Sequence, residues 1–173
     1  MTIDKSIKFI SCKICILTIS DSRKEKNDES GDLLVNRLIE SGHILYKRAI
    51  VVDEVDQIIN KLKEWIDDKE VNIIITTGGT GITKRDVTPE AINKLSDKII
   101  EGFGELFRQI SYNKIGTSTL QSRAMACIAG NTYIFSIPGS PNACKDAWDE
   151  ILKFQLDNRH KPCNFIELIP RLI

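Results

Sequence analysis

The chain has 173 residues, of which 42% are hydrophobic and 28% are charged, a composition typical of a globular protein with an apolar core. Its 24 Lys and Arg residues balance 24 Asp and Glu residues, which disfavours nucleic acid or an anionic membrane as a partner. No apolar run reaches the roughly 18–20 residues that span a bilayer. The first residues carry an acid, Asp4, and no apolar stretch, so we expect no signal peptide and a cytoplasmic protein.

Apolar runs and helical periodicity alternate along the chain. β-Branched runs predict strands, whereas apolar residues at helical spacing, together with capping residues, predict helices. In chain order we expect a strand over Lys13–Ser20, a helix over Ser30–Ser41, a strand over His43–Val52, a helix over Val55–Ile66, a strand over Val71–Thr77, a helix from Thr88, helices over Gly104–Tyr112 and Ser118–Ala129, a strand over Thr132–Ser136 and a helix over Ala143–Leu156.

This alternation predicts an α/β three-layer sandwich with a mainly parallel central sheet. We expect a single domain over residues 1–173, with its core at about 13–156 and an irregular C-terminal tail over 157–173. Parallel strands bring their carboxyl ends to one edge, where open α/β sheets bind ligands. Polar or glycine-rich loops follow all four strands, at Ser20–Arg23, Asp53–Glu54, Gly78–Asp86 and Ile137–Ser140.

Five cysteines and no export signal argue against a disulfide framework. Cys12 and Cys15 have the CxxC spacing of a redox motif or a zinc half-site. Cys15 lies inside an apolar run, and no second pair of cysteines has plausible ligand spacing. We therefore predict that both are buried strand cysteines.

The glycine-rich loop Gly78-Gly79-Thr80-Gly81 allows positive φ angles and lets several backbone N–H groups converge on an anion. The alternative is a tight turn. Asp86 follows this loop, and Asp53 ends the second strand. The two carboxylates would suit Mg²⁺, which shares hard oxygen ligands with substrate phosphates, although either acid could instead belong to a salt-bridged loop.

Ser122 and Arg123 lie in what we predict to be the first turns of a helix, where anions are favoured. Arginine also binds phosphate through two hydrogen bonds. The alternative is an ordinary exposed helix face.

These motifs together resemble the molybdopterin-binding MoaB/Mog family of molybdenum cofactor biosynthesis. The matching segments keep the family's order from Lys13 to about Leu156, and they are Thr76–Gly81, Arg85–Ala91, Gly102–Glu105, Ser122-Arg123 and Ile137–Ala143. Val52 stands where proline is common before Asp53. The residues around 116–123 and the tail are similar to the protein B branch of the family.

The resemblance implies a doubly wound α/β domain that binds molybdopterin and, in one branch, adenylylates it with Mg-ATP and releases pyrophosphate. Asp53 and Asp86 match the family's essential acids and would be the catalytic and metal-binding residues. We expect the ligand-binding residues to be Ser20, Asp21, Gly78, Gly79, Thr80, Gly81, Ser122, Arg123, Pro138, Gly139 and Ser140. The rival hypotheses are a non-catalytic molybdopterin carrier and a generic nucleotide-binding regulatory domain.

The resemblance also implies a homotrimer or homohexamer, and other enzymes of the same pathway are possible partners. The sequence adds a hint of its own. Residues 102–112 carry more large apolar side chains than one helix can bury against one sheet, and these are Phe103, Leu106, Phe107, Ile110 and Tyr112. They predict an exposed patch that neighbouring copies cover, unless they simply fill the core.

Overall fold

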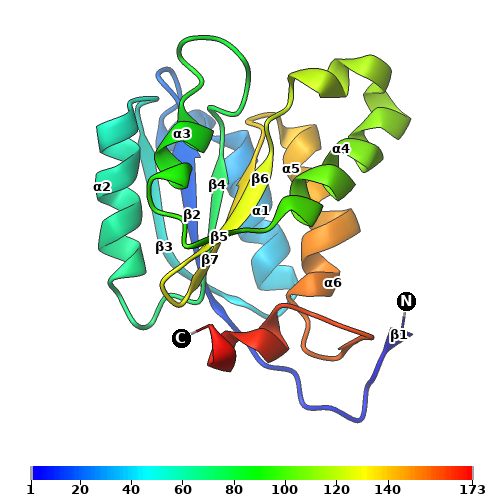
Figure 1. The fold of residues 1–173 in the computed structure, drawn as a ribbon. Coiled ribbons are helices and arrows are strands. Elements are labelled where there is room, and N and C mark those ends of the chain that lie inside the picture. The colour runs from blue at the N-terminus through cyan, green and yellow to red at the C-terminus, as the bar shows by residue number, and fades with distance from the viewer. Residues whose placement is uncertain (1, 173) are drawn as a thin grey trace.

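A six-stranded sheet forms the centre of the protein in the computed structural model, which describes residues 2–172 (Figure 1). β2 pairs in parallel with β3 and β4, and β4 with β7, whereas β6 runs antiparallel to both of its neighbours. The prediction of an α/β fold with a mainly parallel sheet is therefore confirmed. From edge to edge the strands are β3 (Ile44–Val51), β2 (Lys13–Ile19), β4 (Ile73–Thr77), β7 (Thr132–Ile137), β6 (Met125–Ala129) and β5 (Lys98–Ile99).

Helices cover both faces of this sheet (Figure 1). The central strands are buried on both sides, so alternate residues belong to two hydrophobic cores. Ile73 and Ile75 pack in one core, and Ile74 packs in the other. One face is covered by α2 (Val55–Ile66) and α3 (Thr88–Asn93). The other is covered by α1 (Glu29–Glu40), α4 (Glu101–Ile115), and a continuous run of α5 (Pro141–Ala147), a π-helical turn (Trp148–Leu152) and α6 (Lys153–Gln155).

The prediction of a helix over Ser118–Ala129 was wrong. A 3-10 helix, η2 (Gly116–Gln121), is followed instead by strand β6, which returns against β7 with Ala129 opposite Thr132. Gly130, at φ 56°, makes the tight turn between these strands. The small residues of β6 carry little strand signal of their own, so the Gly130-Asn131 pair was interpreted as the end of a helix. The start of α1 also differs, because Asp28 caps this helix in place of Ser30.

A segment near the N-terminus pairs with a segment that precedes the last helical turn of the chain. β1 (Thr2–Ile3) pairs antiparallel with β8 (His160–Lys161) in a small second sheet, and a 3-10 helix, η4 (Ile166–Arg171), follows. The Asn158 side chain also joins these two segments, because it accepts the N–H of Ile10 and donates to the carbonyl of Lys8. The tail, expected to be irregular, is therefore partly ordered by long-range contacts that its own sequence does not reveal.

Two predictions about apolar side chains can be compared with the structure. Cys12 and Cys15 are buried as predicted, and burial raises the pKa of both thiols to about 12. In α4, however, Phe103 and Phe107 belong to the core, with Phe107 only 2% exposed. The prediction that Phe103 and Phe107 belong to an exposed patch is therefore wrong. The apolar side chains that are exposed in this region are Leu106, Tyr112, Ile115 and Leu120.

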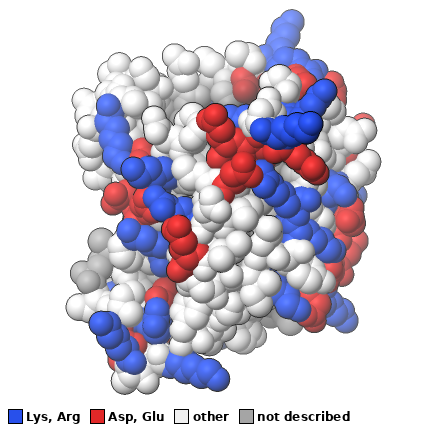
Figure 2. Space-filling model, turned by 180° about the vertical axis from the view of Figure 1, so that it is seen from behind, with Lys and Arg blue, Asp and Glu red and all other residues white. Residues whose placement is uncertain are grey.

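Charged side chains of both signs are intermingled on the face shown in Figure 2 and do not form one large basic or acidic field there. Among residues 2–172, no helix combines the length and the hydropathy that crossing a membrane would need.

His43 generates a prediction about stability. The ring is buried between Phe9 and Trp148, and its Nδ1 accepts the Cys12 N–H at 3.2 Å. Burial lowers the pKa of His43 to about 4, although the Asp157 charge opposes this shift. The unfolded chain takes up this proton near pH 6.5 and the folded chain only near pH 4, so stability falls as the pH drops through that interval.

We expect His43 to account for up to about 3 kcal/mol of lost unfolding free energy between pH 6.5 and pH 4. Urea unfolding of wild type and His43→Gln at several pH values measures this contribution. The difference between the two proteins should shrink as the pH falls across the interval. A difference independent of pH would contradict a buried neutral imidazole.

Candidate functional site

Two loops at the carboxyl ends of adjacent strands form the centre of the candidate site. Gly78–Gly81 follows β4 and Pro138–Ser140 follows β7, and the Gly78 N–H donates to the Ile137 carbonyl at 3.1 Å. The loops are so close that a Cβ atom on Gly139 would lie 3.2 Å from the Gly78 Cα. Beside them lies a cavity of about 430 Å³, whose other wall comes from α4 and η2.

Most of the predicted ligand-binding residues line this cavity. These are Gly78, Gly79, Thr80, Gly81, Ser122, Pro138, Gly139 and Ser140, together with the predicted catalytic residue Asp86. Ser20 and Asp21 line a neighbouring cavity of about 520 Å³ beside β3 instead. Arg123 borders a third, shallower surface with Asp86 and Glu90. Asp53 lies outside all three of these surfaces and lines another one with Glu54 and Arg85. The predicted residues therefore lie at the carboxyl ends of the strands but are divided among separate cavities.

The glycine loop directs its carbonyl groups into the protein. Thr88 donates its hydroxyl to the Gly78 carbonyl and its N–H to the Gly79 carbonyl, both at 3.0 Å. In a planar trans peptide the N–H points opposite to the C=O, so the N–H groups of Gly79 and Thr80 point away from these donors. Neither N–H has an acceptor within residues 2–172. The loop thus presents free donors at the edge of the cavity, as an anion site requires.

Glycine is needed in this loop for two physical reasons. Gly78 and Gly79 adopt φ angles of 108° and 62°, which L-residues with a side chain rarely adopt. A Cβ atom on Gly79 would also lie 2.3 Å from Thr88 Oγ1 and 2.8 Å from both carboxylate oxygens of Asp53. The Asp53 carboxylate therefore packs directly against the loop.

Asp53 is a nearly buried acid, 8% exposed, at the end of β3. Its Oδ1 accepts the Val87 N–H at 3.2 Å, and its own N–H donates to Asp21. Burial raises the pKa of Asp53, and the negative charges of Asp86 and Asp21 raise it further. The predicted pair of acids therefore lies close enough to interact electrostatically.

Asp86 has a different environment. Its Oδ2 accepts the Thr83 N–H and hydroxyl at 2.8 and 2.7 Å. Burial alone would raise the pKa of Asp86, but these bonds, the Gly81 N–H and the Arg123 charge together lower it. Asp86 is therefore ionised at neutral pH and presents a fixed negative charge beside the loop.

Arg123 holds the glycine loop from behind. It follows η2 and does not lie in the first turn of a helix, which corrects the prediction. Its backbone N–H donates to the Thr80 carbonyl, and its guanidinium donates to the Gly81 and Asp86 carbonyls at 2.6 Å each and to Glu90. These bonds hold the loop in place, and Arg123 is not among the residues that line the 430 Å³ cavity.

Arg85 is a residue of the rim for which the sequence predicted no role of its own. It donates two hydrogen bonds to Asp21, at 3.0 and 2.7 Å, and one to Glu54 at 2.7 Å. It thereby joins the loops that follow β2, β3 and β4. Each pair is exposed and adds little to stability alone, but the three-way network fixes the loops relative to one another. A single arginine near several acids carries no sequence signal for such a bridge.

The carboxylates of Asp53 and Asp86 are the candidate ligands for a divalent cation. Within the described part of the chain, no group of three His, Cys, Asp or Glu side chains is placed to hold a metal ion. Two carboxylates alone make a weak site, so any Mg²⁺ would need further oxygen ligands from a phosphate-bearing substrate.

Comparisons with known proteins identify the family to which this chain belongs. The family described as "Probable molybdopterin binding domain" matches residues 15–158. The chain is 47% identical over 160 residues to molybdenum cofactor biosynthesis protein B of Escherichia coli strain K12, covering 92% of this chain and 94% of the relative. It is 45% identical over 146 residues to the protein of that name from Bacillus cereus, covering 84% and 85%.

Solved structures give the same result. A crystal structure of a molybdenum cofactor biosynthesis protein B has a TM-score of 0.85 and 39% identity, covering 94% of this chain and 96% of the other. The tungsten cofactor synthesizing protein MoaB from Pyrococcus furiosus has a TM-score of 0.73 and 37% identity, covering 82% and 91%.

The close packing of Gly79 leads to a prediction. Gly79→Ala should lower the free energy of unfolding by about 2–4 kcal/mol, because it combines a strained φ angle with contacts to Thr88 and Asp53. Gly102→Ala in α4 is the matched control, since a Cβ atom there meets nothing within 4 Å. The control should be neutral or stabilising by up to about 1 kcal/mol. Equal midpoints of chemical denaturation would disprove the close packing of the loop.

Proposed function

The chain belongs to the family of probable molybdopterin-binding domains, and from this premise we propose that it acts in molybdenum cofactor biosynthesis by adenylylating molybdopterin with Mg-ATP. The observation that carries the proposal is the combination of free loop N–H groups with two interacting acids at one rim. The N–H groups suit a phosphate, and the acids suit the cation that accompanies a nucleotide.

In the proposed reaction an oxygen of the terminal phosphate of molybdopterin attacks the α-phosphorus of ATP. A new P–O bond forms, the bond to the bridging oxygen between the α- and β-phosphates breaks, and pyrophosphate leaves. Such transfers need positioning and charge neutralisation and no protein nucleophile. This requirement agrees with a site built from glycine N–H groups and carboxylates.

Different residues of the chain would bind the phosphates and the cation. The N–H groups of Gly79 and Thr80 bind phosphate oxygens, and Ser122 contacts the ligand from the opposite wall of the cavity. Asp53 and Asp86 would hold Mg²⁺, which would neutralise charge on the phosphates. Their environment fits a cation, because the raised pKa of Asp53 reflects burial together with repulsion from Asp86 and Asp21.

A non-catalytic molybdopterin carrier is the second candidate. One observation favours it: both acids already accept backbone N–H groups, Asp53 from Val87 and Asp86 from Thr83, so each has a structural use without a metal. A carrier would bind molybdopterin without releasing pyrophosphate in the presence of ATP. A generic nucleotide-binding domain would instead bind ATP well without any pterin.

We expect Asp86→Asn to reduce pyrophosphate release by about 100-fold or more, because it removes the charge while keeping an acceptor for the Thr83 N–H. Binding of molybdopterin, measured by fluorescence titration, should change little. Asp67→Asn, which alters an exposed acid at the far end of α2, is the control and should be fully active. If the wild-type protein with molybdopterin, ATP and Mg²⁺ releases no pyrophosphate, the enzyme proposal fails and the carrier remains.

We also propose that the protein is a homotrimer or homohexamer. The exposed apolar side chains of α4 and η2 support this assembly, since Tyr112 is 57% and Leu120 79% exposed. The double variant Tyr112→Glu/Leu120→Glu should lower the mass measured by light scattering to that of one 19.5 kDa subunit and leave the circular dichroism unchanged.

Ile39→Glu on α1 is the control, because Ile39 is similarly exposed at 54% outside this patch. Its mass should equal that of the wild type. A wild-type mass of one subunit at micromolar concentration would rule out the assembly.

A further inference from the structure

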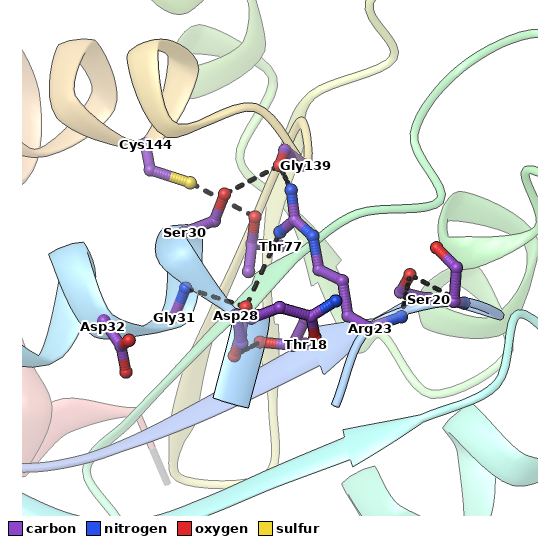
Figure 3. Close-up of polar contacts among 12 residues, drawn as sticks. Thr18, Ser20, Arg23, Asp28, Ser30, Gly31, Asp32, Thr77, Gly139 and Cys144 are labelled. Carbon is purple, nitrogen blue, oxygen red and sulfur yellow. Dashed lines mark hydrogen bonds and ion pairs between the residues drawn. The ribbon is translucent and has the colours of Figure 1, made fainter. Parts of the chain in front are cut away.

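The second loop of the site is also held by its carbonyl groups. Thr77 Oγ1 donates to the Pro138 carbonyl at 3.1 Å. The Gly139 carbonyl accepts two hydrogen bonds, from Arg23 Nη2 at 2.6 Å and from Ser30 Oγ at 2.7 Å (Figure 3). Both lone pairs of this oxygen are therefore used, and its direction is fixed by side chains from the loop after β2 and from the first turn of α1.

Asp28 fixes these donors in turn. Its carboxylate is completely buried and caps α1, accepting the Gly31 N–H at 3.0 Å. It also accepts the Thr18 hydroxyl at 2.7 Å, and its Oδ1 lies 3.5 Å from Arg23 Nη1 (Figure 3). Arg48 donates a further hydrogen bond to it at 2.8 Å. So many donors around one buried anion leave Arg23 and the start of α1 little freedom to move.

The orientation of the peptides decides what faces the cavity. The peptide bonds of the loop are trans, so fixing the Pro138 and Gly139 carbonyls toward the interior turns the N–H groups of Gly139 and Ser140 the opposite way. Neither N–H has an acceptor in the part of the chain that the structure describes. Both residues line the 430 Å³ cavity, directly beside Gly78.

We propose that Arg23 and Ser30, fixed by Asp28, are positioning residues that direct the N–H groups of Gly139 and Ser140 toward a phosphate group of the ligand. This inference rests on the proposed function only in taking a phosphate-bearing ligand. Neither side chain lines the cavity, and Arg23 borders the neighbouring one. Both therefore act through the loop, as Thr88 and Arg123 do for the glycine loop.

Amide ¹H–¹⁵N spectra during a titration with inorganic pyrophosphate test this role. In the wild type we expect the amide protons of Gly139, Ser140, Gly79 and Thr80 to shift downfield together. In the double variant Arg23→Gln/Ser30→Ala, the shifts of Gly139 and Ser140 should disappear while those of Gly79 and Thr80 persist. The dissociation constant for pyrophosphate should rise about 10-fold. The single variant Arg23→Lys keeps a cationic donor, so the Gly139 and Ser140 amides should retain part of the shift seen in the wild type.

Lys24→Gln is the matched control, because it removes a neighbouring positive charge that makes no side-chain contact with the Pro138–Ser140 loop. The inference is overturned if this control weakens binding as much as the double variant, since charge alone would then explain the effect. It is also overturned if the Gly139 and Ser140 amides do not respond in the wild type, or respond equally in the variant.

If the double variant does not fold, the single variant Ser30→Ala is titrated in the same way, and the shifts of the Gly139 and Ser140 amides should be reduced. Failure of the proposed function would look different. Absent pyrophosphate release together with responsive amides would reject the adenylyltransferase and leave the positioning role standing.

Discussion

Hydrogen bonds from side-chain donors to loop carbonyl groups are the interactions on which the candidate site depends. A glycine-rich loop has high conformational entropy and no side chains to hold it in place. Thr88 and Arg123 on one loop, and Arg23 and Ser30 on the other, supply this restraint by fixing the carbonyls. Because the peptide plane is rigid, fixing a carbonyl group also fixes the N–H group of the same peptide in the opposite direction.

The charges around this site oppose one another. Free N–H groups attract an anion, whereas Asp53, Asp86 and Asp21 repel it. Arg85 compensates Asp21 through two hydrogen bonds, and Arg123 contributes to the lowered pKa of Asp86. Among the described residues 2–172, Asp53 accepts only the Val87 N–H, and its pKa is raised. A phosphate bound together with a cation would satisfy both the donors and the acids, whereas a phosphate alone would satisfy only the donors.

The sequence predicted where the site lies better than how it is built. Strand ends are visible as apolar runs that stop at polar or glycine-rich residues, so the Gly78–Gly81 and Pro138–Ser140 loops could be placed on one rim. The side chains that donate to the loop carbonyl groups could not be identified in this way. Asp28 looks like an ordinary polar loop residue, and only the fold brings it beneath Thr18 and beside Arg48. For the same reason Arg123 was predicted as a ligand contact, although the direction of its guanidinium is set by carbonyl groups far along the chain.

A carrier and an adenylyltransferase would need the same wall of N–H groups, so the acids must distinguish them. For a protein that only carries an anionic ligand, a buried carboxylate beside the binding loop is unfavourable, since it weakens binding and costs desolvation energy. The raised pKa of Asp53 reflects this unfavourable environment. The side-chain hydrogen bond from the Val87 N–H, at 3.2 Å, stabilises the carboxylate only weakly. An unfavourable charge packed against a candidate binding loop is typical of groups whose partner is absent from the free protein. This imbalance at Asp53, more than the glycine loop, supports a cation-dependent reaction over simple storage.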